Sequence, residues 1–401
     1  MISINEAQQT ILDTVMTLET EKVSLLKSLN RITAEDHIAS WDIPPTDNSA
    51  MDGYAFSSAA VTGISLPVSG FLPAGEERCI PVAPGEAVRI MTGAPIPSGC
   101  DTVVPLEEVV VEGNSIRITS LVRKGSHVRR RGEDVRQGTV VITAGSLLRP
   151  QEIGILSAMG TTSPDVYRKA RVAIIATGDE LLEPGATPAS GRIIDSNSYS
   201  LAAQVLDAGG DPLLVGIAPD DLDATCDKIR AGLSADFVVI SGGVSAGDRD
   251  FVRMAIERLG GTISFWKVNM KPGKPVAFAL LDEKPVLALP GNPVAAMVSF
   301  ELFVRPALLK AMGHRKIFRP EVTAIIDEPI MNPGSRPHLI RGLVTTKNGR
   351  YHVTTTGNQS SGRLSSLVLG NALIRLEHET SIQAGTETEV MLLDRSFGKE
   401  Y

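Results

Sequence analysis

The sequence predicts a multidomain α/β plus β protein, in which an open, mainly parallel α/β sheet domain lies between an inserted all-β domain and a β-rich C-terminal domain. Two observations support this prediction. Continuously apolar segments alternate with helical stretches over residues 171–312, whereas short β-branched runs separated by turns dominate residues 41–139 and 313–401. The length of 401 residues also suffices for about two to three domains.

A short amphipathic helix opens the chain. Ser3 and Glu6 match a capping box, in which a hydroxyl and a carboxylate each accept a hydrogen bond from a backbone amide. Apolar residues then follow at helical spacing, namely Ala7, Ile11, Val15 and Leu18. A second helical segment begins at Pro150 and ends at Gly160. We expect these two helices to pack together.

The residues between these helices differ in composition. From Trp41 onward the chain is rich in Pro, Asp and Gly, and its short β-branched runs alternate with turn clusters. This pattern indicates a small all-β domain over residues 41–139. We therefore expect residues 1–40 and 140–170 to form one discontinuous N-terminal domain that the β domain interrupts.

The α/β domain is predicted over residues 171–312. Its strand candidates are continuously apolar, as strands covered on both faces should be, and lie at 172–176, 212–216, 237–241 and 286–289. Helical stretches alternate with them at about 196–208, 221–232, 250–259 and 293–305. In such sheets ligands bind beyond the carboxyl ends of the strands.

The C-terminal residues 313–401 are predicted to form a compact β domain. No convincing helix follows Arg319, and Asn348-Gly349 lies between β-rich flanks. This dipeptide is a strong signal for a two-residue hairpin turn.

Composition and charge exclude several classes of function. The chain carries 39 Lys+Arg against 46 Asp+Glu, a formal net charge of −7, and only 4% aromatic residues, which argues against general binding of nucleic acid or anionic membranes. It contains no apolar run of bilayer length and no signal peptide, so we expect a cytoplasmic protein. The three cysteines, Cys79, Cys100 and Cys226, fit no disulfide or zinc pattern and are interpreted as idle thiols.

Four loops that follow strand candidates are rich in glycine and polar residues, at 177–180, 241–250, 267–275 and 289–293. Glycines let backbone amides approach a ligand, and helix N-termini favour phosphate or another oxyanion. The third loop adds Lys267, Lys271 and Lys274, and the fourth places Asn292 and Pro293 at the start of a helix. Each loop alone is as consistent with an ordinary turn, but four together favour an anion site.

Carboxylates accumulate near these loops, namely Asp179, Glu180, Asp195, Asp220, Asp221, Asp248 and Asp250. Hard oxygen ligands suit Mg²⁺ that bridges a phosphate ester, and Asp250 is preferred because it follows the glycine loop. Any single Asp is otherwise a helix cap or a turn residue.

The inserted β domain contains polar clusters of its own. Asp52 lies among residues that otherwise look buried, and Thr92 lies within RIMTGAP. The run Arg129–Asp134 is by default a solvated face, with an internal ion-pair network as the alternative.

Linked motifs extend along nearly the whole chain, namely PPTDNSAMDGYAF, RIMTGAPIPSGCDTVV, RRRGEDV, IIATGDEL, GRIIDSNS, ISGGVSAGDRDF, FWKVNMKPGKPVAF and LPGNPVAAMVSFELFVRP. In sequence and order they resemble the MoeA family of molybdopterin molybdenumtransferases, which includes the gephyrin E domain. The resemblance implies an α/β domain like that of molybdopterin adenylyltransferases and a C-terminal β-barrel. It also implies a homodimer whose active cleft lies between the α/β domain of one subunit and the inserted domain of the other.

The reaction that the resemblance implies inserts molybdate into adenylylated molybdopterin and releases AMP, with Mg²⁺ as cofactor. The functional positions carried over are Asp52, Thr92, Asp134, Glu180 and Asp250 as catalytic residues, and Asp220 with Asp250 as metal ligands. Those carried over for substrate binding are Ser245, Lys267, Lys271, Lys274, Pro290, Pro293, Arg341 and Ser361. Ala295 departs from the pattern, because many relatives have a serine there that could bind an oxyanion.

Alternatives remain open at this point. A molybdopterin adenylyltransferase shares the α/β domain, and a non-catalytic scaffold like the gephyrin E domain shares the whole outline. Tungstate has nearly the shape and charge of molybdate, so the sequence leaves the preferred oxyanion open. An adenylyltransferase partner that delivers the substrate is a further expectation from the family.

Overall fold

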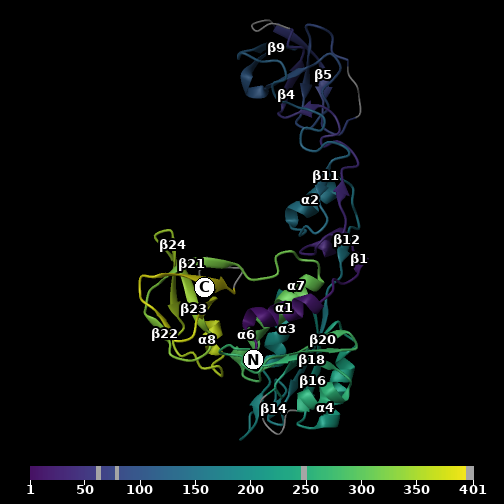
Figure 1. The fold of residues 1–401 in the computed structure, drawn as a ribbon. Coiled ribbons are helices and arrows are strands. Elements are labelled where there is room, and N and C mark those ends of the chain that lie inside the picture. The colour runs from purple at the N-terminus through teal and green to yellow at the C-terminus, as the bar shows by residue number, and fades with distance from the viewer. Residues whose placement is uncertain (60–64, 77–80, 245–250, 394–401) are drawn as a thin grey trace. The chain divides into compact units, whose positions relative to one another are not determined.

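The computed structural model describes residues 1–59, 65–76, 81–244 and 251–393. The chain divides into two compact units (Figure 1). The large unit contains Met1–Lys22, Asn30–Ala34 and the residues from Asp165 onward, and the small unit contains Val23–Leu29 and Glu35–Pro164. The four domain ranges predicted from the sequence are finer than this division and stay predictions.

A six-stranded sheet forms the centre of the large unit, with the order β16-β13-β17-β20-β19-β18. Its strands are β13 (Arg171–Thr177), β16 (Asp211–Ala218), β17 (Phe237–Ser241), β18 (Thr262–Trp266), β19 (Ala277–Leu281) and β20 (Lys284–Leu289). The four strands from β16 to β20 run parallel, whereas β19 and β18 are antiparallel to their neighbours. The predicted mainly parallel sheet is confirmed, and its antiparallel edge is an addition.

Helices cover both faces of this sheet. Val172 and Ile174 lie in one apolar cluster with residues of α3 (Asn197–Asp207), α6 (Pro293–Ser299) and α7 (Arg305–Ala311). Ala173 and Ile175, which alternate with them, lie in a second cluster with residues of α4 (Leu222–Gly232) and α5 (Phe251–Arg258). This alternation explains why the strand is apolar at every position. A π-helical turn, Phe300–Val304, joins α6 to α7.

The N-terminal helix α1 (Ile4–Thr14) begins as predicted. The Ser3 Oγ accepts a hydrogen bond from the Glu6 amide at 3.2 Å, and Glu6 Oε2 accepts one from the Ser3 amide at 2.7 Å. The buried side chains of α1 join the apolar cluster of α7 in the large unit. The second predicted helix, α2 (Pro150–Ala158), belongs to the small unit, where it packs on the 3-10 turn Leu25–Ser28. The two predicted helices thus belong to different units, and their packing together stays a prediction.

A closed β-barrel follows in the C-terminal region, with the order β21-β24-β23-β25-β27. Its strands are β21 (Glu321–Ile326), β23 (His338–Lys347), β24 (Arg350–Thr355), β25 (Ala372–Leu376) and β27 (Glu387–Leu392). Strands β22 (Ile330–Asn332) and β26 (Thr380–Ile382) pair beside it, and a short helix, α8 (Ser365–Val368), was not predicted. The predicted hairpin is confirmed, because Asn348 and Gly349 have φ values of 51° and 75° between paired Lys347 and Arg350.

The small unit is mainly β, as predicted. Its sheet has the order β7-β4-β6-β5-β9-β8. These strands are β4 (Gly53–Phe56), β5 (Ser65–Leu72), β6 (Ala87–Ile90), β7 (Thr102–Pro105), β8 (Val109–Glu112) and β9 (Ser115–Ile118). Two short pairs complete it, β3 (Asn48–Ser49) with β10 (Val128–Arg129) and β2 (His37–Ile38) with β11 (Val140–Ile142). Gly53 is required at the start of β4, because a Cβ there would lie 2.0 Å from the Val104 carbonyl oxygen.

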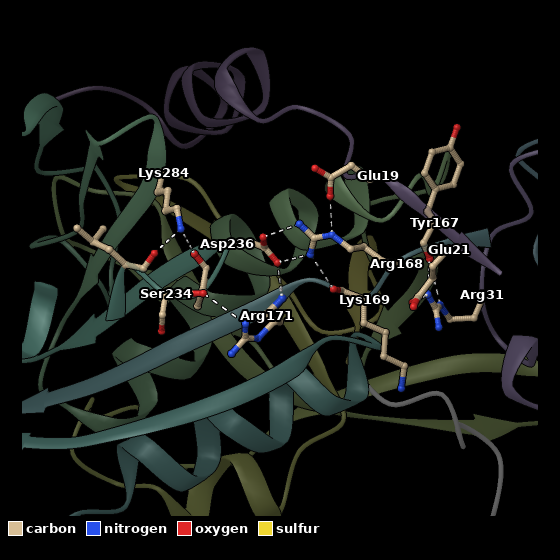
Figure 2. A network of polar contacts seen from close by, with 12 residues as sticks. Glu19, Glu21, Arg31, Tyr167, Arg168, Lys169, Arg171, Ser234, Asp236 and Lys284 are labelled. Atoms are coloured by element: carbon tan, nitrogen blue, oxygen red, sulfur yellow. Dashed lines mark hydrogen bonds and ion pairs between the residues drawn. The ribbon is translucent and has the colours of Figure 1, made fainter. Parts of the chain in front are cut away.

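A polar network fixes the amino end of the parallel sheet (Figure 2). Arg168 follows β12 (Asp165–Tyr167), which pairs with β1 (Thr20–Lys22), and donates two hydrogen bonds of 2.7 Å to the Asp236 carboxylate. It also donates to Glu19 at 2.9 Å, and the Arg171 amide donates to Asp236 at 2.8 Å. Burial opposes ionisation of Asp236, but these hydrogen bonds outweigh it and lower its pKa. The network anchors the N-terminal segment at the edge opposite the ligand-binding edge.

Among the described residues, no helix combines the length and the apolar character needed to cross a membrane.

Candidate active site

A pocket of about 500 Å³ opens at the carboxyl ends of β13, β17 and β20. Among the predicted site residues, its lining contains Glu180, Asp220, Pro290 and Pro293. All four predicted loops therefore contribute to one pocket, as the parallel topology requires, although the loop 267–275 does so only through Pro275. A larger cavity of about 850 Å³ lies beside α3 and α8, but its lining is mostly apolar and includes none of the described site residues.

Glycines let the backbone of two loops close in on this pocket. Gly242 has a φ of 95°, and a Cβ there would lie 2.7 Å from the Thr177 carbonyl oxygen. Gly178 has a φ of 145°, and a Cβ there would lie 2.4 Å from the Glu180 carboxylate. The Glu180 side chain thus folds back over Gly178, and any larger residue would displace it.

The carboxylates divide into pocket residues and caps. Glu180, Asp220 and the capping residue Asp195 line the pocket, and Asp179 accepts a hydrogen bond from the Asp220 amide at 3.0 Å. Asp221 is the N-cap of α4, and Asp195 accepts from the Ser198 amide at 3.1 Å at the start of α3. The alternative interpretation as caps thus applies to these last two. Ser245, Asp248 and Asp250 lie outside the described residues.

The carboxylates of this pocket are potential ligands of Mg²⁺. Among the described residues, no group of three or more His, Cys, Asp or Glu side chains could hold a metal ion. Glu180 and Asp220 nevertheless supply two hard carboxylates at one pocket, beside Asp195, which already accepts a hydrogen bond from the Ser198 amide. Mg²⁺ usually takes one or two carboxylates and completes its shell with water and substrate phosphates, so this donor set fits a substrate-bridging ion.

The lysine loop lies beside the pocket rather than in it. From this loop only Pro275 contributes to the lining, which contains neither Lys nor Arg in the described part of the chain. Lys271 is exposed and pairs through its backbone with the barrel, donating to the Pro337 carbonyl at 2.8 Å and accepting from the Leu339 amide at 2.7 Å. Lys274 is also exposed and Lys267 half-buried. The cations of the predicted anion site are therefore not lysines of the pocket wall.

The barrel supplies a buried cation close to this loop. Arg341 is fully buried, and its guanidinium donates from Nε to Ser366 Oγ at 3.1 Å and from Nη2 to the Ser360 carbonyl at 3.1 Å. Its Nη1 has no partner among the described residues, and burial lowers the pKa of Arg341 to about 10. Ser299 Oγ and His338 Nε2 are likewise buried without a partner in the described chain. Unsatisfied buried polar atoms of this kind are costly, and a bound ligand or water would satisfy them.

Ser361, in the loop between β24 and α8, contacts the pocket wall directly. Ser361 Oγ accepts a hydrogen bond from Asn292 Nδ2 at 3.1 Å, and the Ser361 carbonyl accepts one from the Val294 amide at 3.1 Å. Since Asn292 lines the pocket, Ser361 joins the barrel to it. Ala295 is 3% exposed in the first turn of α6, so no hydroxyl reaches out from this position.

His338 leads to a prediction about acid stability. Burial and the nearby charges of Lys271 and Arg341 lower its pKa to about 4, so the folded state binds fewer protons than the unfolded state between about pH 6.5 and 4. Stability is therefore lost as the pH falls through this window, by at most about 3 kcal/mol. We expect His338→Gln to remove this loss, measured by urea unfolding at pH 7 and pH 4.5. The exposed His378→Gln is the control, and an unchanged pH dependence in His338→Gln would contradict the prediction.

The remaining predicted residues belong to the small unit. Asp52 accepts two hydrogen bonds of 2.7 Å from Thr92, one from its amide and one from its hydroxyl, and these lower the pKa of Asp52. Two predicted site residues that lie 40 positions apart are thus in direct contact. Asp134 is exposed and its amide donates to the Ile43 carbonyl at 3.1 Å. The neighbouring Arg130 and Arg131 are exposed, as expected of a solvated face, and form ion pairs with Asp47 and Asp42, which lie outside the run, instead of the predicted internal network.

Asn197 was missed as a pocket residue. It lines the pocket from the first turn of α3, and its Nδ2 donates to Ser241 Oγ and to the Gly291 carbonyl, both at 2.7 Å. The sequence presented it only as the start of a helix. The signal that could have found it is its position two residues after Asp195 at the same carboxyl edge of the sheet.

Three family models match the chain in order. The MoeA N-terminal region (domain I and II) matches residues 2–160, the probable molybdopterin binding domain matches residues 173–310, and the MoeA C-terminal region (domain IV) matches residues 323–393.

Curated relatives and solved structures agree with these models. The chain is 38% identical to a molybdopterin molybdenumtransferase of Nostoc, over 94% of this chain and 89% of the relative. It is 35% identical to molybdopterin molybdenumtransferase 2 of Mycobacterium tuberculosis, over 97% and 99% of the two chains. The molybdopterin biosynthesis moeA protein from Pyrococcus horikoshii has a TM-score of 0.82 at 32% identity, covering 98% of this chain and 100% of the other.

The sheet, its polar pocket and the flanking β-rich parts define a multidomain protein built around an α/β domain of the probable molybdopterin binding type. The chain belongs to the MoeA family, whose curated members are named molybdopterin molybdenumtransferase. The family and the fold class that the motifs implied are therefore confirmed.

Proposed function

We propose that this protein is a molybdopterin molybdenumtransferase that inserts molybdate into adenylylated molybdopterin and releases AMP. The observation that carries the proposal is the buried Arg341 guanidinium, whose Nη1 lacks a partner among the described residues beside the lysine loop. A guanidinium remains charged at neutral pH even when burial lowers its pKa, so it is suited to a small dianion such as molybdate. A net charge of −7 makes such a local cation necessary.

Each part of the site has a role in this proposal. Arg341 and Lys271, whose charges both lower the pKa of His338, hold the oxyanion. Ser299 offers a further buried hydroxyl. The pocket at the carboxyl edge of the sheet takes the adenylylated substrate, with Pro290 and Pro293 shaping its wall. Ser361 ties the two together through Asn292. The remaining predicted binding residues, Lys267, Lys274 and Ser245, are assigned to the same anions.

Glu180 and Asp220 would hold Mg²⁺, with Asp250 as the third carboxylate predicted from the sequence. When bound, the ion offsets the negative charge of the substrate pyrophosphate. The dithiolene sulfurs belong to the substrate, so the protein need supply no thiol. Consistent with this, burial and the neighbouring Asp101 raise the pKa of Cys100 to about 12, which makes it a poor nucleophile.

We also propose a homodimer, in which Asp52, Thr92 and Asp134 of one subunit complete the cleft at the α/β domain of the other. Two further expectations from the sequence stay predictions. They are an adenylyltransferase partner that delivers the substrate and a location in the cytoplasm.

The test is release of AMP by the purified protein from adenylylated molybdopterin, molybdate and Mg²⁺. We expect AMP release to require molybdate and to fall at least about 100-fold in Glu180→Gln, which removes a charge from the pocket. Glu183→Gln is the matched control, because Glu183 is exposed and lies outside the described lining. Absence of AMP release where a known relative releases it would reject the proposal. ATP consumption with free molybdopterin would instead support the adenylyltransferase, and loss of both activities the scaffold.

A further inference from the structure

Asn197 is held in one orientation by two loops of the pocket. It is 8% exposed, and its Nδ2 donates to Ser241 Oγ and to the Gly291 carbonyl at 2.7 Å each. A carbonyl oxygen accepts hydrogen bonds but never donates them, so Nδ2 must face Gly291. Ser241 Oγ can in turn donate to the Pro290 carbonyl, at 3.5 Å. Both Nδ2 protons are therefore used, and the amide cannot be turned round without losing these hydrogen bonds.

The other end of this amide lacks a protein partner. Asn197 Oδ1 is buried and accepts no hydrogen bond from any described residue, although Asn197 lines the pocket. Thr177, which is 7% exposed and lines the same pocket, likewise has an Oγ1 without a partner in the described chain. A buried acceptor left unsatisfied is destabilising. The orientation imposed by Gly291 thus leaves one fixed acceptor available to a ligand.

The chemistry of this end of the pocket selects the part of the ligand that it can bind. Asn197 Oδ1 can only accept, so the ligand group must carry an N–H or O–H donor. The described lining contains no Lys or Arg, which disfavours a phosphate at this position. A neutral heterocycle with an exocyclic amino group meets both conditions.

We propose that Asn197 is a specificity-determining residue, whose Oδ1 accepts a hydrogen bond from the exocyclic amino group of a fused pyrimidine ring of the substrate. The inference rests on the proposed function, because adenylylated molybdopterin carries two such groups, the 6-amino group of adenine and the 2-amino group of the pterin. The same side chain couples the bound ring to the loops that end β17 and β20, through Ser241 and Gly291. Thr177 Oγ1 offers the ring a second polar contact.

The test compares two pairs of probes that differ at the amino group. AMP is compared with IMP, and pterin with lumazine, by ligand-observed NMR titration of the purified full chain. A site built to pair an amino group rejects the analogue that lacks it, so we expect wild-type protein to bind the amino compound of one pair about 10- to 100-fold more tightly. The pair that shows the preference identifies the ring that Asn197 contacts. Equal or undetectable binding within both pairs overturns the proposal, and places water at Oδ1.

Variants separate recognition of the ring from support of the loops. We expect Asn197→Ala to lose the preference for the amino compound. We expect Ser241→Ala to bind both compounds of the pair equally more weakly but to keep the preference, because Gly291 still orients the Asn197 amide. A preference that survives in Asn197→Ala overturns the proposal. Thermal unfolding checks each variant, and Asn197→Ser replaces Asn197→Ala if the latter fails to fold. Because the assay measures binding, it is independent of AMP release: a retained preference without turnover would count against the proposed function alone.

Discussion

Replacing Arg341 by Met is expected to raise the KM for molybdate by roughly 100-fold, because removing one partner of a desolvated charge pair costs about 2–5 kcal/mol. The free energy of unfolding should change by no more than about 1 kcal/mol. Met fills a similar volume, and the desolvation penalty that is removed with the incompletely paired cation offsets the loss of its hydrogen bonds to Ser366 and Ser360. Loss of function without loss of stability is the signature of a charge retained for a ligand.

Two measurements on the same preparation check this result. AMP release is titrated with molybdate, and unfolding is followed in urea. Arg350→Met is the matched control, since Arg350 is exposed on the neighbouring strand β24 and should leave both quantities unchanged. A variant that unfolds much more easily, with an unaltered KM in the fraction that stays folded, would show that Arg341 serves the barrel alone.

The position of Arg341 illustrates what the sequence could not provide. Within HLIRGLV a single arginine looks like the exposed member of a strand, and only the resemblance marked it as functional. Its burial depends on residues 359–366, which supply Gln359, Ser360 and Ser366 as partners. Contacts so distant along the chain leave no local periodicity to detect.

The parallel sheet was predictable for the opposite reason. Strands β13, β17 and β20 are buried on both faces and their sequences are continuously apolar, which is a local signal. Strand β18 was not predicted, because Thr262–Trp266 is only partly buried at the sheet edge. Strand β16 is also an edge strand, and its Leu213 and Leu214 remain 36% and 44% exposed despite an apolar sequence.

The lysine loop shows how a correct motif can be given the wrong geometry. Three lysines among prolines and glycines predicted an anion site, and the loop does reach the pocket at the carboxyl edge through Pro275. Its backbone, however, pairs with the barrel at Pro337 and Leu339, and neither the loop nor the barrel sequence specifies that pairing. Asn197 was missed for a related reason, since its partners come from two later parts of the chain, Ser241 from the end of β17 and Gly291 from the loop after β20.

Asp52→Asn and Glu180→Gln are each expected to reduce AMP release at least about 100-fold while the fold persists. An asparagine at position 52 can still accept from the Thr92 amide and hydroxyl, so it removes the charge and keeps the two hydrogen bonds. A glutamine at position 180 has the shape of the glutamate that lies over Gly178. Both substitutions therefore test charge rather than structure.

Mixing the two inactive variants tests the proposed dimer. If the cleft combines Asp52 of one subunit with Glu180 of the other, a mixed dimer contains one cleft with both defects and one intact cleft. Random exchange makes half of the dimers mixed, so about a quarter of the wild-type activity should return. A cleft formed within one chain would always contain one defect, and no activity would return. Subunit exchange is verified separately by mass spectrometry of differently tagged chains, so that failure to exchange is distinguished from failure to complement. Recovery that tracks the mixed-dimer fraction would require both carboxylates to act on the same substrate from different subunits.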